Sequence, residues 1–428
     1  MQDFSLYSER RTELCQEIRK KYKKDNGIIL LCANVESDRI PFRQDSSFYY
    51  LTGLTEPGLF LTIDLESQKT RLFIPKYTID RKQWMATGIF DFVCDEPSVA
   101  EIDELVELGD PIAGYTLHLY ENMNHFAHLT AFLKTTVLQN KPVFTLLSEA
   151  AQQYVQQRTY ITRFAAVVPS LAQSLVDISG IVAQMRRLKH MKEIESLFAA
   201  VEITAMAHEA AAAVIKPGIG EAEVHGNIAY VMYGSNATEA FASIVGSGFN
   251  STVLHYHKNN DQLKTGELVV VDIGAEKDMY CADLTRTYPV SGRFSARQKV
   301  VYELVLETQE YIASIAKPGM YLKNNSHHDQ SLHHLAKAFL AKAGYEQYFP
   351  HGIGHYLGLD VHDVGSYQEP LQEGDVFTIE PGIYIPEEAL GVRIEDDYWL
   401  TPKGAVCLSE GLPKTVAEVQ QAMADKSE

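Results

Sequence analysis

The stretch Leu263-Lys-Thr-Gly-Glu-Leu-Val-Val-Val-Asp-Ile-Gly274 decides how this chain is interpreted, because Leu371-Gln-Glu-Gly-Asp-Val-Phe-Thr-Ile-Glu-Pro-Gly382 repeats its pattern 108 residues later. In each copy a glycine and an acid precede an apolar run that ends on a second acid, Asp272 in the first copy and Glu380 in the second. A repeat of about 100 residues is too long for a solenoid unit and predicts a duplicated half-domain. Two such halves would place their terminal acids around one central cleft.

Two further matches support the duplication. The helical segments Glu193–Ile215 and Arg297–Ala316 both run into Lys-Pro-Gly, at an offset of 101, and Leu254-His255 corresponds to Val361-His362 at an offset of 107. Lys-Pro-Gly alone is ordinary helix-stop chemistry. Three matches in the same order, at nearly constant offset, favour an internal repeat.

Each copy continues into a predicted hairpin that returns with another acid. A turn centred between positions 277 and 278 places Asp283 directly opposite Asp272, with Cβ atoms about 5 Å apart. A turn centred between positions 387 and 388 places Glu395 opposite Glu380. Four carboxylates this close would repel one another and have raised pKa values unless cations lay between them. The sequence therefore predicts a site for two metal ions.

A histidine-rich segment, His351-Gly-Ile-Gly-His-Tyr-Leu-Gly-Leu-Asp-Val-His362, lies inside the second copy. Its glycines argue against a helical zinc-binding pair, and we expect His355 to join the four acids as a ligand. One imidazole among four carboxylates favours Mn²⁺, with Co²⁺, Fe²⁺ or Zn²⁺ as substitutes. The pairs His327-His328 and His333-His334 are interpreted as solvated surface without a role.

Composition bounds the remaining classes of function. The 428 residues suggest about two domains, and the net charge of −18 argues against nucleic-acid or anionic-membrane partners. The five cysteines are odd in number and widely spaced, which fits unpaired thiols in a reducing compartment. The first residues lack the apolar core of a signal peptide, and no apolar run approaches the ~20 residues that span a bilayer. We therefore expect a cytoplasmic protein.

Residues 1–175 are expected to form a separate α/β domain. An amphipathic first helix, strands at 28–33, 59–65 and 71–75, and helices at 125–138 and 146–157 predict a parallel or mixed sheet covered by helices. The basic stretch Met185–Lys192 begins the second domain's first long helix, and we interpret it as a packing segment.

The ordered motifs of residues 272–396 closely resemble those of the pita-bread metallopeptidases, and within them the aminopeptidase P group, with prolidase a close relative. The matching segments are Asp283-Leu-Thr-Arg-Thr287, His351–Asp363, Thr378-Ile-Glu-Pro-Gly-Ile-Tyr384, Val392-Arg-Ile-Glu-Asp396 and, in the N-terminal domain, Arg43–Gly53. One departure is Tyr256-His-Lys-Asn259, where relatives often carry Tyr-Thr-x-Asn.

The resemblance implies an α/β N-terminal domain, residues 1–175, followed by an α+β pita-bread catalytic domain of two pseudo-symmetric halves, residues 176–428. It implies a homodimer or homotetramer that acts on peptides with Xaa-Pro N-termini. It also implies two divalent ions per chain, usually Mn²⁺, and a set of catalytic helpers. The implied metal ligands are Asp272, Asp283, His355, Glu380 and Glu395, and the implied helpers are His255, His351, His362 and Arg393.

The chemistry of such a site follows from its ligands. Two cations can bridge one water and supply hydroxide at neutral pH, which would attack the carbonyl before proline. Glu380 would relay a proton to the leaving amine, His255 and His362 would hydrogen-bond the developing oxyanion, and Arg393 would hold a ligand carboxylate.

Alternatives remain open. A prolidase would require a free proline carboxylate. A non-catalytic binding protein or a metal-free hydrolase of the same fold is disfavoured because all five ligand positions are retained.

Overall fold

The computed structural model describes residues 4–36, 41–78, 100–113, 122–148 and 154–424. The chain divides into two compact units, Met1–Met185 and Arg186–Glu428. Strand β6 (Leu175–Asp177) of the first unit's sheet crosses the boundary expected after residue 175, and helix α6 (Ser179–Arg187) begins in the first unit and ends in the second. Each unit has its own sheet system and is described separately.

The first unit contains one six-stranded mixed sheet in the order β4-β3-β2-β1-β5-β6. The central strand β1 consists wholly of buried residues, which pair antiparallel with β2 and parallel with β5. The mixed sheet expected from the sequence is confirmed. The other strands are β2 (Phe60–Asp64), β3 (Thr70–Ile74), β4 (Glu104–Glu107) and β5 (Val143–Thr145), and β1 is Ile28–Cys32.

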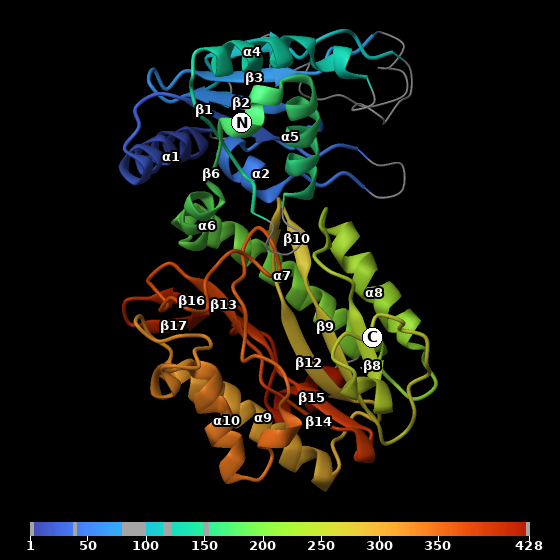
Figure 1. Ribbon diagram of the computed structural model, residues 1–428. Helices are drawn as coiled ribbons and strands as arrows, with labels where there is room; N and C mark the ends of the chain where they lie inside the picture. The colour runs from blue at the N-terminus through green and yellow to red at the C-terminus, as the bar shows by residue number, and fades with distance from the viewer. Residues whose placement is uncertain (1–3, 37–40, 79–99, 114–121, 149–153, 425–428) are drawn as a thin grey trace. The chain divides into compact units, whose positions relative to one another are not determined.

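Helices α4 and α5 cover one face of this sheet (Figure 1). Phe60 of β2 lies against Phe126, Tyr160 and Phe164, with ring centroids 4.7–5.8 Å apart. The second of these helices begins at Val155 rather than near residue 146, so that expectation was wrong where the structure describes the chain; residues 149–153 lie outside the described residues. Among the described residues of this unit, the helices before α6 are α1 (Ser5–Tyr22), α2 (Ser46–Thr52), α4 (Ala127–Leu138) and α5 (Val155–Val167).

The second unit repeats one arrangement twice, as the sequence predicts. In the first copy the Gly218 N–H donates to the Leu263 carbonyl at 2.8 Å, and in the second the Gly319 N–H donates to the Leu371 carbonyl at the same distance. Both glycines have a positive φ, of 89° and 93°, in the turn that follows the long helix. The helices are α7 (Met191–Val214) and α8 (Glu221–Gly234) in the first copy, α9 (Ala296–Ile315) and α10 (Leu332–Lys342) in the second, and α11 (Val416–Ala424) after both.

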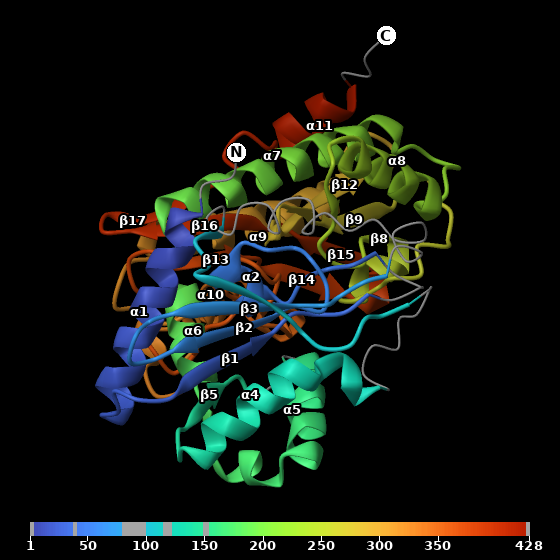
Figure 2. The ribbon, with the colours of Figure 1, turned by 90° about the horizontal axis from the view of Figure 1, so that it is seen from above.

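The strands of the second unit form four small sheets, with orders β11-β10-β7, β12-β9-β8, β13-β16-β17 and β14-β15. Helices α7 and α8 lie side by side (Figure 2). The strands are β7 (Thr238–Glu239), β8 (Ile244–Ser247), β9 (Leu268–Ile273), β10 (Ala275–Lys277), β11 (Tyr280–Cys281), β12 (Leu284–Pro289), β13 (Val376–Ile379), β14 (Gly382–Ile385), β15 (Leu390–Arg393), β16 (Asp396–Thr401) and β17 (Gly404–Cys407).

The first hairpin has a different register from the predicted one. Asp272 lies opposite Thr285, and Asp283 precedes β12. The turn centres on Asp278 and Met279, whose φ angles are 49° and 74°, instead of one residue earlier. Two successive positive φ angles are typical of a type I′ turn, which matches the twist of the strands that it joins. Because the shift is two residues, both acids stay on the same face of the sheet.

The second hairpin has the predicted register. Ile379 pairs with Asp396 and Gly382 pairs with Arg393, so that the intervening Glu380 lies opposite Glu395. The Ile394 N–H donates to the Pro381 carbonyl at 3.4 Å between these two paired sections. The hairpin therefore continues across the acid pair.

Helix α7 is long and apolar enough to cross a membrane, and half of its most apolar stretch is buried in the structure. Two glutamates, Glu202 and Glu209, interrupt the apolar run in the sequence. The Thr204 hydroxyl accepts from the Ala275 N–H at 2.9 Å, and the His208 ring contacts the Leu284 carbonyl oxygen at 3.0 Å. These contacts make α7 a core helix of the second unit.

The basic stretch before α7 binds acids of the same unit. Arg187 is fully buried and donates to both oxygens of Asp375 at 2.7 and 2.8 Å. Arg186 and Lys189 form ion pairs with Asp363 at 2.6 and 3.1 Å. Asp363 follows His362, so these pairs anchor the segment that carries this histidine.

Candidate metal centre

The structure brings the five predicted metal ligands into one cavity of the second unit. They come from both halves of the repeat, and the four carboxylates lie at or near the ends of strands. Asp272 is in β9, Asp283 precedes β12, His355 is in the glycine-rich segment, Glu380 follows β13, and Glu395 lies between β15 and β16.

His355 reaches the site because its segment runs antiparallel beside β13. The Thr378 N–H donates to the His355 carbonyl at 2.9 Å, and the Glu380 N–H donates to the Ile353 carbonyl at 2.8 Å. A Cβ atom at Gly354 would lie 1.9 Å from the Thr378 carbonyl oxygen. Glycine is therefore required for this close pairing, which places His355 beside Glu380.

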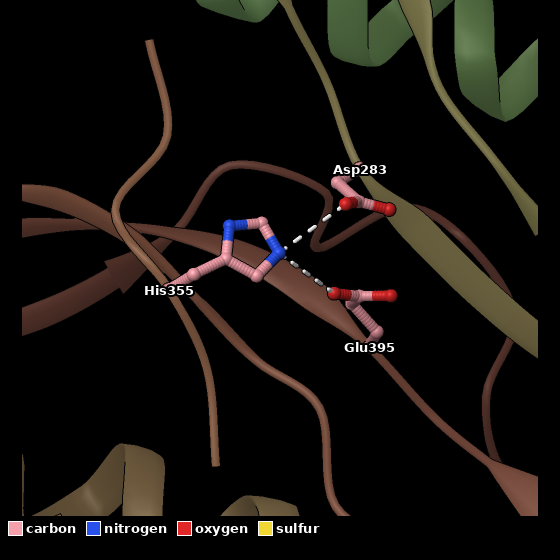
Figure 3. Close-up of side chains that lie close together, drawn as sticks. All are labelled: Asp283, His355 and Glu395. Atoms are coloured by element: carbon pink, nitrogen blue, oxygen red, sulfur yellow. Dashed lines mark ion pairs between the residues drawn. The ribbon is translucent and has the colours of Figure 1, made fainter. Parts of the chain in front are cut away.

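Three of the side chains converge tightly enough to hold one cation, as Figure 3 shows. His355 Nε2 lies 3.3 Å from Asp283 Oδ2 and 4.0 Å from Glu395 Oε1. His355 Nδ1 lies 3.1 Å from the Tyr356 carbonyl oxygen, to which it donates. That hydrogen bond leaves the Nε2 lone pair directed at the carboxylates, which is the tautomer that a metal ligand needs.

The two aspartates each carry a buried oxygen without a hydrogen-bond partner among the described residues. These atoms are Oδ1 of Asp272 and Oδ1 of Asp283. Asp272 Oδ2 accepts from Arg393 Nη2 at 2.5 Å. Buried polar atoms rarely lack a partner in folded proteins, and bound cations would satisfy both oxygens.

The acids of the site carry more negative charge than the local basic groups neutralise. Burial raises the pKa of Glu380 to about 7, against the opposing effects of His355 and Arg393. Burial, followed by repulsion from Asp272, raises the pKa of Asp283 well above its usual value. Burial and the charge of Asp283 do the same for Glu395. Oxygen-rich, mutually repelling acids with one imidazole fit divalent cations.

Two residues for which the sequence suggested no role support the site: Thr285 connects the two hairpins, and Tyr384 contacts Arg393 within the second. The Thr285 hydroxyl donates to Glu395 Oε2 at 2.7 Å and accepts from Arg393 Nε at 3.2 Å. The Tyr384 hydroxyl accepts from Arg393 Nη1 at 2.9 Å. Both residues lie inside the motifs that define the site, at strand positions whose side chains share a face with the acids. That placement is the signal that could have found them.

The hydrogen bonds of His351 determine its protonation. Because Tyr384 accepts from Arg393, its own proton is available for His351 Nε2, 2.8 Å away. His351 Nδ1 lies 2.8 Å from the Gly352 carbonyl oxygen, to which it donates. Burial and Arg393 lower the pKa of His351 to about 3. His351 is therefore a neutral ring whose two nitrogens both have protein partners.

The remaining predicted helpers, His255 and His362, line the same cavity, which has a volume of about 640 Å³. The His362 ring lies edge-on to His355, with centroids 4.3 Å apart. Partial burial, followed by the neighbouring rings of His355 and His255, lowers the pKa of His362 to about 4. His257, at the position that departs from the family motif, lies near His255 with nearly parallel rings and centroids 6.0 Å apart.

The histidines of residues 327–334 differ from the expected solvated surface at one position. His327 and His328 are exposed, but His333 is buried in the first turn of α10 against Phe349. Burial lowers the pKa of His333 to about 4. The polar residues around His333 gave no indication in the sequence that the first turn of α10 faces the core.

Comparisons with known proteins agree over nearly the whole length of the chain. Residues 195–402 match the profile of "Metallopeptidase family M24", and residues 7–89 match "Aminopeptidase P, N-terminal domain". The chain is 32% identical to the Xaa-Pro aminopeptidase of Haemophilus influenzae, over 97% of this chain and 96% of the relative. It is 30% identical to human Xaa-Pro aminopeptidase 3, over 98% of this chain and 86% of the relative. Among solved structures, aminopeptidase PepP of Pseudomonas aeruginosa superposes with a TM-score of 0.83 at 28% identity, covering 99% of both chains.

Proposed function

We propose that this chain releases the N-terminal residue from peptides whose second residue is proline, because it belongs to metallopeptidase family M24 and within it to the Xaa-Pro aminopeptidases. It is a metallo-exopeptidase with the family's N-terminal domain and a pita-bread domain of two pseudo-symmetric halves. The observation that carries the proposal is the convergence of Asp283, His355 and Glu395 on one point, flanked by Asp272 and Glu380.

We propose that the five ligand residues hold two divalent cations and that Mn²⁺ is the ion used. Four carboxylates and one neutral imidazole form the oxygen-dominated ligand set that Mn²⁺ prefers. The two partnerless oxygens, on Asp272 and Asp283, support two sites rather than one. When bound, the cations supply Lewis acidity that brings the pKa of a water molecule near neutrality.

Glu380 is proposed to move the proton during cleavage. A carboxyl group in the cavity can accept a proton from the attacking water and return it to the leaving group. Its Oε1 lies 3.9 Å from His355 Nε2, beside the ligand cluster. Cleavage before proline expels a secondary amine, which must gain a proton, and Glu380 lines the cavity in which it would leave.

Arg393 and His351 are proposed to position the reacting groups. Arg393 holds Asp272 Oδ2 in one orientation and supports the Tyr384 hydroxyl. His351 is held between the Tyr384 hydroxyl and the Gly352 carbonyl. It lines the same cavity as Glu380 and is uncharged. His255 and His362 are left to hydrogen-bond the substrate carbonyl.

We predict that His255→Ala and His362→Ala lower kcat by about 10²-fold or more, the size of effect that one lost hydrogen bond to a developing oxyanion has elsewhere. Metal content should stay unchanged, because neither ring belongs to the carboxylate cluster. Elemental analysis of the purified variants provides the check, with exposed His328→Ala as control. Loss of a metal ion in either variant would make that residue a ligand.

The choice between an aminopeptidase and a prolidase depends on how the cavity treats a free proline carboxylate. A prolidase needs a cation there, as a bidentate arginine provides. Arg393 is the one arginine among the described residues that line the cavity, and Asp272, Thr285 and Tyr384 already occupy it. This arrangement favours tripeptides and longer peptides.

We predict that Ala-Pro-Ala is hydrolysed at its first bond with higher kcat/KM than Ala-Pro, in Mn²⁺-supplemented buffer. Release of alanine, followed by chromatography, is the measurement, and Ala-Ala-Ala and an EDTA-treated sample are the controls. A preference for the dipeptide would indicate a prolidase, and no cleavage of either peptide would contradict the proposed function. A binding protein of the same fold would release no alanine.

We further propose a reducing, cytoplasmic setting and a homodimer or homotetramer. The first is supported by cysteines that the structure describes, because Cys15, Cys32 and Cys407 are free thiols and the first two are buried. The second rests on the resemblance to the aminopeptidase P group. Sedimentation velocity would measure the mass in solution.

A further inference from the structure

A second cavity, of about 390 Å³, adjoins the catalytic one. The two share Gly352, Gly354 and Tyr367 as lining residues. A Cβ atom at Gly352 would meet no atom closer than 3.7 Å, so local packing does not demand a glycine at this border. The two glycines place no side chain at the border between the cavities.

Lys323 lines the second cavity and is the one charged residue among its described lining residues. It lies on a loop in which residues alternate between buried and exposed, with Leu322 and Asn324 buried and Lys323 and Asn325 exposed. The His333 N–H donates to the Leu322 carbonyl at 3.0 Å, and the Asn324 N–H donates to Ser331 Oγ at 3.1 Å. The loop is thus anchored on the start of α10 and presents Lys323 and Asn325 together.

The surroundings of Lys323 are basic. Its ammonium forms no ion pair or hydrogen bond within the part of the chain that the structure describes. The charged neighbours that lower the pKa of His333, after burial, are Lys323, His334 and Lys337. An unpaired cation with basic neighbours attracts an anion from outside the chain.

We propose that the second cavity receives the peptide segment that follows proline, and that Lys323, together with Asn325, binds a carboxylate there. This inference rests on the proposed function. An aminopeptidase holds one residue on the N-terminal side of the cleaved bond, so the segment after proline is the longer part of the substrate and needs the adjoining space. The carboxylate is either an acidic side chain at the third position or the C-terminus of a tripeptide.

The test compares matched peptides on the wild-type metalloenzyme and on Lys323 variants. Ala-Pro-Glu-NH₂ against Ala-Pro-Gln-NH₂ measures the side-chain carboxylate, and Ala-Pro-Ala against Ala-Pro-Ala-NH₂ measures the terminal one. We expect wild type to prefer at least one carboxylate peptide by about two- to five-fold in kcat/KM, the size of an exposed ion pair. Lys323→Gln should abolish the preference and Lys323→Glu should reverse it, and 0.5 M NaCl should weaken it in wild type.

Lys342→Gln is the matched control, because Lys342 is exposed at the end of α10 and is not among the residues that line either cavity. It should retain the wild-type preference. Equal rates for both peptide pairs in wild type, or an undiminished preference in Lys323→Gln, would overturn the inference while leaving the proposed function intact. So would a Lys323-dependent difference between Glu-Pro-Ala and Gln-Pro-Ala, which would assign the cavity to the first residue. Failure to cleave any Xaa-Pro peptide would overturn both.

Discussion

Glu380→Ala is expected to reduce the turnover of Ala-Pro-Ala by at least about 10³-fold even at saturating Mn²⁺, because a lost proton relay alone costs 10²–10⁴-fold. The same substitution removes a side chain from the ligand cluster. The measurement is kcat with metal titrated to saturation. Glu373→Ala is the control, because Glu373 is exposed in the turn before β13 and should have wild-type activity.

Glu380→Gln separates the two roles of this side chain. The amide retains the shape of the carboxyl group and one oxygen ligand but cannot carry the proton. We expect a Glu380→Gln enzyme that keeps measurable metal and still has kcat lowered by at least about 10²-fold. Activity within a few-fold of wild type in either variant at saturating Mn²⁺ would exclude Glu380 from proton transfer.

The acid pairs illustrate how far sequence alone determines this site. Glu380 and Glu395 lie opposite each other as predicted, because the hairpin that carries them continues in one register through both sheets. Asp272 and Asp283 do not, because the turn after β10 places Asp278 and Met279 at positive φ. Asp278 suits the first position of a type I′ turn, but Met279 stands where glycine is usual, so the sequence lacked the Asp-Gly signal of such a turn.

Sequence patterns did not predict the contacts between the two halves of the repeat. Thr285 and Glu395, which are distant in the chain, exchange backbone hydrogen bonds at 3.1 and 3.3 Å. This pairing gives the Thr285 hydroxyl its position between Glu395 and Arg393. Hydrophobic periodicity indicates which face of a strand is buried, but it carries no information about which strand of the other half lies beside it.

The sequence predicted the role of His355 but not the packing that places it. Its chemical type and the neighbouring glycines indicated a functional segment, and only the structure shows why a glycine stands at position 354. The close approach of the Thr378 carbonyl leaves no room for a Cβ atom. Close backbone approach is a recognised reason for glycine, but a sequence without its fold does not identify the approaching atom.

Metal-free enzyme is expected to lose thermal stability as the pH rises from 6.5 to 8.5. Folding raises the pKa values of Glu380, Asp283 and Glu395 above the roughly 4 of an unfolded carboxyl group. Above pH 4 the native state therefore binds more protons than the unfolded state, so its free energy of unfolding falls as the pH rises, until the native state has lost these protons too. The rings of His351 and His362, whose pKa values are lowered by folding, have the opposite effect, which is largest below about pH 6.5 and fades towards the alkaline end of this window.

Metal should reverse this trend, because a cation competes with protons for the same oxygens. Mn²⁺ at about 100 times its dissociation constant contributes about 2.7 kcal/mol, which corresponds to an increase in Tm of roughly 5–10 °C for a domain of this size. We expect a larger increase at pH 8.5 than at pH 6.5, measured by differential scanning calorimetry on EDTA-treated and Mn²⁺-loaded samples. Glu395→Gln, with one buried acid fewer, should show a shallower pH dependence without metal, whereas Glu373→Gln should match wild type. A metal-free Tm that stays constant or rises between pH 6.5 and 8.5 would contradict this prediction. It would mean that these acids do not keep their protons in the folded state, and that other groups of the protein relieve the repulsion between them.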